Sequence, residues 1–333
     1  MFYKSTMDSC PKGLGTPSPL HTNVRTAKKR TRCRVSAAPA VCGLLLLGAA
    51  AIFAARPFGE WQPAKSVDAG GLLAVNTPSL EGCPIESPDK HNLFFASNRD
   101  GGKGLIDIWV ADREGAHHPW GAPSNLPEPV NSTYDDFCPT PLQDGRLLFV
   151  SARPSPCGGG TDIYETRLHP VKGWLEPKNL GCQVNSFGSE FSPSIVDAKG
   201  QVILFFSSNR LGTQQIFQSV LGSDGTWSPA TPVSELNSPF EDARPNVRKD
   251  GLEIFFDSTR QGGAPDIWSA VRSSISEPWS APFPLGPNVN TTAGESRPSL
   301  SRDGNRLYFG STRGGGQGNS DIYMSTRLHG GKR

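Results

Sequence analysis

The sequence is poor in charged residues, which make up 19% of its 333 residues. Its formal net charge of +2 averages two different regions, because eight basic residues and one acidic residue fall within residues 1–55. The remainder carries 25 basic and 30 acidic residues, a net charge of −5. Proteins that neutralise a nucleic-acid backbone need an excess of basic residues. We therefore expect no nucleic-acid partner.

Several catalytic and metal-binding motifs are also missing. The sequence has no Gly-x-Ser-x-Gly nucleophile elbow and no Cys-x-x-Cys pair. Its glycine-rich stretches, such as Gly101–Gly104 and Gly314–Gly316, lack the Lys-Ser/Thr of a phosphate loop. His117 and His118 have no other His or Cys at metal-ligand spacing. We therefore assign no catalytic residue, no metal and no cofactor; a channel cation such as Ca²⁺ has no support in these motifs.

Long hydrophobic runs are absent except for one. A basic cluster between Arg25 and Arg34 precedes an uncharged stretch from Val35 to Ala55. This order is typical of a secretory signal, although roughly 20 residues also suffice to span a bilayer as an uncleaved anchor. We predict a polar and basic region at 1–34, a signal or anchor segment at 35–55, and a body at 56–333 that is exported to the periplasm or beyond the cell.

The body consists of one repeat in five copies. Each copy has a strand that ends in Ser-x-Arg, at 93–99, 147–153, 204–210, 254–260 and 307–313. A glycine-rich loop and a second strand follow, which begin at Asp107, Asp162, Gln215, Asp266 and Asp321. A proline-led strand precedes each copy, at Pro84, Pro139, Pro193, Pro245 and Pro298. The interval between copies is about 53 residues, which is typical of β-propeller blades.

The ends of the chain indicate how the ring of blades closes. The fifth copy lacks its last strand, whereas the N-terminal part of the body has the spare elements Trp61-Gln62-Pro63 and Val75–Glu81. The latter matches Val289–Glu295 in its Val-Asn-Thr and in its distance to Glu. We therefore predict an all-β fold, a five-bladed β-propeller of four-stranded antiparallel blades whose last blade is closed by the N-terminal strand.

These repeats resemble a known family. Ser-x-Arg, a glycine-rich loop and Asp-Ile-Tyr/Trp, led by Pro-Ser-Leu-Ser-Arg-Asp-Gly at 298–304, are similar to the WD40-like repeats of TolB-type propellers. The resemblance covers residues 61 to about 328. It implies a propeller fold and protein partners in the cell envelope.

One acidic position recurs three residues before each leading proline: Glu81, Asp136, Glu190, Asp242 and Glu295. The first strand of a blade lines the central channel, so these five carboxylates are expected to form a ring at one channel mouth. Such a ring could bind a cation or a cationic ligand. Alternatively, the carboxylates accept backbone hydrogen bonds or pair with Arg244 or Arg297, since residues that repeat usually serve the repeat.

Other recurring charges are expected to serve the blades. We predict that the arginines of Ser-x-Arg pair with the aspartates that begin the next strand, and that Arg210 needs another acceptor because Gln215 replaces the aspartate there.

Four cysteines, an even number, lie in the part of the chain that we expect to be exported. The repeat register favours disulfides between Cys83 and Cys138, which precede the leading prolines of adjacent blades, and between Cys157 and Cys182 within one copy.

The sequence favours an exported, non-catalytic propeller that acts as a binding or scaffolding module. Its expected partner is an envelope protein or a glycan held at a propeller face, with membrane contact only through the N-terminal segment. The alternative is a glycoside hydrolase that uses channel carboxylates, because five-bladed propellers host such enzymes and hydrolysis needs two carboxyl groups at a defined separation.

Overall fold

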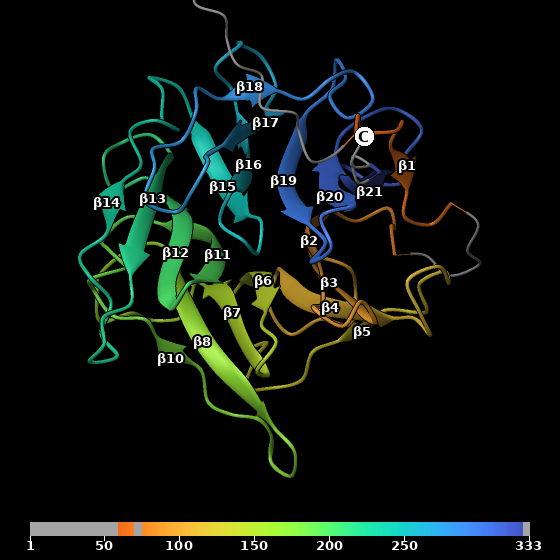
Figure 1. Ribbon diagram of the computed structural model, residues 1–333. Helices are drawn as coiled ribbons and strands as arrows, with labels where there is room; N and C mark the ends of the chain where they lie inside the picture. The colour runs from red at the N-terminus through yellow and green to blue at the C-terminus, as the bar shows by residue number, and fades with distance from the viewer. Residues whose placement is uncertain (1–58, 70–74, 329–333) are drawn as a thin grey trace, which may run out of the picture. The chain divides into compact units, whose positions relative to one another are not determined.

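The computed structural model describes residues 59–69 and 75–328 as an all-β protein of five sheets around a central axis (Figure 1). The innermost strands are β2 (Glu81–Glu86), β6 (Asp136–Pro141), β11 (Glu190–Ala198), β15 (Asp242–Val247) and β19 (Glu295–Leu300). The second strands are β3 (Asn92–Ser97), β7 (Arg146–Ser151), β12 (Gln201–Ser208), β16 (Glu253–Ser258) and β20 (Arg306–Ser311). The third strands are β4 (Asp107–Asp112), β8 (Asp162–His169), β13 (Gln215–Val220), β17 (Asp266–Val271) and β21 (Asp321–Thr326).

The outermost strands are only two residues long. They are β5 (Ser124–Asn125), β10 (Lys178–Asn179), β14 (Thr231–Pro232), β18 (Phe283–Pro284) and β1 (Lys65–Ser66). Each sheet is one antiparallel blade; we number the blades 1 to 5 by their inner strands β2, β6, β11, β15 and β19. Blade 2 carries an additional short strand, β9 (Gly173–Trp174), in a hairpin with β8 that extends away from the ring (Figure 1). The predicted five-bladed propeller is confirmed.

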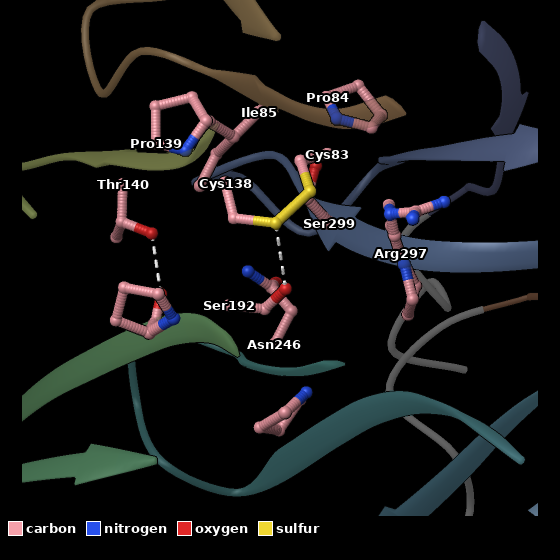
Figure 2. Close-up of a pocket in the computed structure, with 13 residues that line it drawn as sticks. Cys83, Pro84, Ile85, Cys138, Pro139, Thr140, Ser192, Asn246, Arg297 and Ser299 are labelled. Carbon is pink, nitrogen blue, oxygen red and sulfur yellow. Dashed lines mark hydrogen bonds between the residues drawn. A yellow bond between two sulfur atoms is a disulfide. The ribbon is translucent and has the colours of Figure 1, made fainter. Parts of the chain in front are cut away.

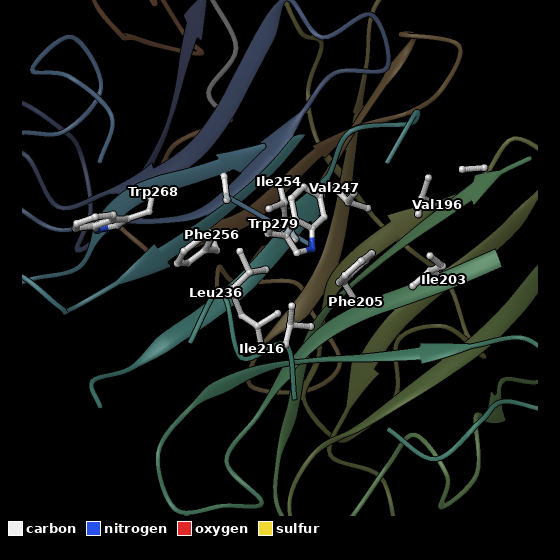
Figure 3. Close-up of a cluster of buried hydrophobic side chains, with 13 residues drawn as sticks. Val196, Ile203, Phe205, Ile216, Leu236, Val247, Ile254, Phe256, Trp268 and Trp279 are labelled. Atoms are coloured by element: carbon white, nitrogen blue, oxygen red, sulfur yellow. The ribbon is translucent and has the colours of Figure 1, made fainter. Parts of the chain in front are cut away.

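The blades pack through strands that are apolar on both faces. The cluster between blades 3 and 4 is representative (Figure 3): Phe205 of β12 meets the Trp279 ring edge-on, with centroids 6.1 Å apart. Phe205 and Phe256 are fully buried there. Burying a side chain of this size stabilises the fold by roughly 1.5–3 kcal/mol, so the second strands supply much of the cohesion between blades.

The N-terminal part of the body closes the ring, as predicted. Strand β1 pairs with β21, so that Lys65 lies opposite Met324. The buried Asn76 side chain then accepts from the Ile322 N–H at 2.7 Å and donates to the Ile322 carbonyl at 3.1 Å. Asn131 bridges the backbone of Ile108 in blade 1 in the same way. A residue near the start of the propeller thus completes its last blade.

Charged groups reinforce the same closure. Glu86 of blade 1 accepts hydrogen bonds from Arg306 and Tyr308 of blade 5. Lys90 of blade 1 pairs with Asp303 of blade 5 at 2.8 Å. Burial acts to raise the pKa of Asp303, but hydrogen bonds from Lys90 and Ser301 outweigh it and hold this pKa well below its usual value.

Within residues 59–69 and 75–328, no helix is long and apolar enough to cross a membrane. The segments predicted at 1–34 and 35–55 lie outside the described residues.

We expect Asn76→Ala to lower the free energy of unfolding by about 2 kcal/mol, because it leaves the buried N–H of Ile322 without its partner and removes one of the hydrogen bonds to the Ile322 carbonyl. Asn131→Ala is the matched variant inside blade 1 and should cost a similar amount. Urea denaturation measures both. If Asn76→Ala had no effect while Asn131→Ala destabilised the protein, the proposed ring closure would be wrong.

We expect Asp303→Asn to lower stability at neutral pH and to matter progressively less in acid. A carboxylate with a depressed folded pKa stabilises the fold above its unfolded pKa of about 3.9, and this contribution is lost as the pH falls through the folded pKa. Urea denaturation of wild type and variant at about pH 7, 5 and 3 measures the difference. A difference that did not change with pH would contradict this assignment.

Candidate functional site

The five predicted ring carboxylates, Glu81, Asp136, Glu190, Asp242 and Glu295, begin the five inner strands and are fully buried. Glu190 shows their common environment. It accepts from the N–H and hydroxyl of Ser186 at 3.0 and 2.6 Å, and from the Ser208 hydroxyl at 2.7 Å. The guanidinium of Arg210 completes the set at 2.9 Å. The other four ion pairs are Arg99–Glu81, Arg153–Asp136, Arg260–Asp242 and Arg313–Glu295.

The predicted partners of the Ser-x-Arg arginines were therefore wrong. These arginines do not pair with Asp107, Asp162, Asp266 or Asp321 but turn back onto the carboxylate of the first strand. Arg210 also pairs with the carboxylate of its first strand, so the presence of Gln215 instead of an aspartate does not deprive it of a partner. The reason is geometric: Arg210 lies beyond the end of β12, where its Nε donates to Ser208 and its guanidinium stacks on Phe217 at 4.8 Å.

The aspartates that begin the third strands have a different task. Asp321 accepts from the N–H of Gln317 at 2.9 Å, and Asp107 likewise accepts from the N–H groups of Lys103 and Gly104. Asp107 and Asp321 thus hold the glycine-rich loops that precede them in place.

The pairing with arginine limits the capacity of the five ring carboxylates to bind a cation. A cation at the ring would compete with five guanidinium groups that already neutralise the carboxylates. Among residues 59–69 and 75–328, no cluster of three or more His, Cys, Asp or Glu side chains could hold a metal ion.

The two positions after each carboxylate differ between blades. The first holds Gly82, Phe137, Phe191, Ala243 and Ser296. The second holds Cys83, Cys138, Ser192, Arg244 and Arg297, all with φ between 47° and 56°. The register with the second strand shifts at this point in every blade, which is a β-bulge that redirects a side chain. The proline that follows has no N–H to lose from the ladder. We call these ten residues the axial mouth.

Both predicted disulfides, Cys83–Cys138 and Cys157–Cys182, are present. The first joins blades 1 and 2 at the axial mouth, where Ser192 donates to the Cys138 sulfur at 3.3 Å (Figure 2). A cavity of about 30 Å³ lies beside it on the axis. Arg297, Asn246 and Ser299 also line this cavity (Figure 2).

The cationic side of the axial mouth has one buried counter-charge. Arg244 Nη1 lies 2.6 Å from Asp257 Oδ1, and Asp257 Oδ2 accepts from the Arg297 backbone N–H at 2.7 Å. Burial raises the pKa of Asp257, against the effect of Arg244. Burial and the charge of Arg244 lower the pKa of Arg297 to about 10, against the effect of Asp257. Arg297 therefore stays protonated at neutral pH.

A wider groove of about 880 Å³ lies at the outer rim of blades 4 and 5. Its lining includes Trp279, with the Arg272 guanidinium 4.2 Å above the ring, and Glu253, which is paired with Arg327. It contains no residue of the axial mouth.

The sequence reasoning missed the axial mouth as a site. It named Arg244 and Arg297 only as possible partners of the ring carboxylates, and it did not single out Phe137, Phe191 or Asp257. A usable signal was present: within an aligned repeat, the positions that change from copy to copy follow directly after the constant carboxylate.

No protein-family model and no curated protein sequence matches this chain. Among solved structures, the catalytic domain of a GH62 α-L-arabinofuranosidase from Coprinopsis cinerea is 14% identical, with a TM-score of 0.55 over 81% of this chain and 98% of that one. A thermostable family-43 glycoside hydrolase is 13% identical, with a TM-score of 0.55 over 78% and 93%. TolB from Acinetobacter baumannii is 17% identical, with a TM-score of 0.46 over 76% and 56%. At such identities the likeness establishes the propeller fold.

These comparisons correct the functional prediction. Similar structures with TM-scores above 0.5 include arabinofuranosidases and a family-43 glycoside hydrolase, which counts against the predicted non-catalytic binding or scaffolding module. The predicted β-propeller is supported, whereas membership of the TolB-type family is not established by a TM-score of 0.46.

We expect Asp136→Asn to lower the free energy of unfolding by about 3–5 kcal/mol, because it leaves the Arg153 guanidinium without its buried counter-charge. Asp197→Asn, an exposed position on β11, is the control and should change stability by less than about 0.5 kcal/mol. Urea denaturation compares the two. Equal stabilities for the two variants would mean that the ring ion pair does not support the fold.

Proposed function

We propose that this chain is an exported glycoside hydrolase that holds its glycan at the axial mouth. The observation that carries the proposal is where the repeat varies. The carboxylate, the Ser-x-Arg arginine and the leading proline recur in all five blades, whereas the two axial-mouth positions vary among glycine, alanine, serine, cysteine, phenylalanine and arginine. Residues that serve the fold of a repeat protein recur, so we assign the variable positions to a ligand.

The chemistry of the axial mouth suits a sugar. Phe137 and Phe191 of blades 2 and 3 are half-buried, with ring centroids 5.9 Å apart. Arg244 and Arg297 of blades 4 and 5 supply hydrogen-bond donors. Ligand sites commonly combine apolar surface with a few placed polar groups, and a sugar ring offers both an apolar face and hydroxyl groups to such a pair of surfaces.

The ring carboxylates are not the catalytic groups in this proposal, because each is buried and paired with arginine. Hydrolysis of a glycosidic bond requires one carboxyl group as acid and a second as base or nucleophile. We assign these roles to Asp135 and Glu241, which directly precede two ring carboxylates and so lie on the same face of the propeller. Asp135 is half-buried and accepts from the Ile106 N–H at 3.1 Å, whereas Glu241 is exposed.

Two further observations support the proposal. Similar propellers with TM-scores above 0.5 include arabinofuranosidases from Coprinopsis cinerea, Podospora anserina and Lactobacillus brevis. Two disulfides are consistent with an oxidising compartment outside the cytosol, where a polymeric glycan would be met.

We expect the purified protein to release reducing sugar from a panel of arabinofuranosides and plant polysaccharides, and Asp135→Asn and Glu241→Gln to lose activity by roughly 10²–10⁴-fold. The control is Glu176→Gln, an exposed carboxylate between β9 and β10, which should keep full activity. Thermal melting checks that all three variants fold. Absence of turnover on the whole panel, or full activity in both site variants, would refute the proposal.

A further inference from the structure

We propose that the axial mouth binds the carboxylate of an acidic sugar, a uronic acid unit, with Arg297 as the principal cation and Arg244 beside it. The sugar part of this inference rests on the proposed function, while the carboxylate part rests on the charges and the cavity alone.

The charges of the axial mouth are unbalanced. The carboxylate of Asp257 pairs with the Arg244 guanidinium, whereas from Arg297 it accepts only the backbone N–H, which leaves the positive charge of the Arg297 side chain over. Among the described residues, no carboxylate forms a salt bridge with the Arg297 side chain, whose only hydrogen bond is a long one of 3.4 Å to Ser296. Removing a cation from water without a partner is costly, so this site favours an anion.

Unused hydrogen-bond donors line the same cavity. The Ser299 hydroxyl is buried and has no partner within the described residues. Asn246 is nine-tenths buried; its Oδ1 accepts from the Leu300 N–H at 2.8 Å, which leaves its Nδ2 as a donor. Buried polar groups normally have partners, so a ligand that accepts hydrogen bonds would complete this site.

The size of the cavity suits a carboxylate. A cavity of about 30 Å³ has room for roughly two water-sized groups, at 10–15 Å³ each. Two oxygens of a carboxylate fit that space. A sugar ring is larger, so the ring would remain outside while its carboxylate enters. A planar carboxylate also matches the fork of a guanidinium group.

Blade 1 leaves room for the Arg297 side chain. At the position that holds Phe137 and Phe191 in blades 2 and 3, blade 1 has Gly82. A Cβ at Gly82 would lie 3.2 Å from Arg297 Cδ and 3.5 Å from its Nη1. The contact with Cδ is tighter than most, so a side chain larger than that of glycine would crowd Arg297.

The test is calorimetric titration of the full-length protein with galacturonic acid oligomers and with the corresponding neutral galactose oligomers. We expect wild type to bind the acidic oligomer at least about tenfold more tightly, as a charged hydrogen bond implies. Arg297→Ser copies the residue that blade 3 tolerates at the same positive φ, so it should fold and lose that preference. Arg302→Ser, an exposed arginine beyond β19, is the charge-matched control and should keep it. Gly82→Leu should reduce the preference without removing any charge.

The outcomes separate this inference from the proposed function. An Arg297-dependent preference for the acidic oligomer without turnover would support the carboxylate site and count against the hydrolase. Hydrolysis of neutral glycans, with equal binding of acidic and neutral oligomers, would support the hydrolase and overturn the inference. Tighter binding of a peptide with a free C-terminal carboxylate, or of inorganic sulfate, would also overturn the assignment to a uronic acid.

Discussion

The buried ion pair between the first and second strands of each blade is the interaction on which the rest of the molecule depends. In it, a carboxylate such as Glu190 meets the arginine and the serine of Ser-x-Arg, together with a backbone N–H. A buried ion pair offsets the free-energy cost of removing its charges from water only when its hydrogen bonds are complete. In these blades the hydrogen bonds of the pair are complete. It fixes the first residue of every inner strand and thereby the starting point of the bulge that follows.

The bulge converts a symmetric scaffold into an asymmetric site. A regular strand would alternate its side chains between the two faces of the blade, but the positive φ at Ser192 or Arg297 turns that side chain toward the axis. Because the ion pair and the proline hold the backbone on either side, the residue between them can change without loss of the fold. The ring thus presents a disulfide, Ser192 and Arg297 at the axial cavity.

The sequence predicted the fold well and the site poorly, for physical reasons. The recurring Ser-x-Arg and leading-proline motifs and the interval between them were sufficient to predict the number of blades, the ring closure and both disulfides. The arginine pairing was missed because Arg210 extends beyond the end of its strand, where strand alternation no longer indicates direction. The axial mouth was missed because a bulge with positive φ at Arg244 or Arg297 leaves no recognisable pattern in the sequence. In addition, Asp257, which accepts from the Arg297 N–H, comes from the blade before that of Arg297.

The most direct test of the axial mouth as the ligand site is a crystal structure of the protein soaked with a uronic acid oligosaccharide. We expect electron density for a sugar ring against Phe137 and Phe191, with its carboxylate next to Arg297. Density for the oligosaccharide only in the rim groove beside Trp279, with the axial mouth unchanged, would contradict this assignment of the site.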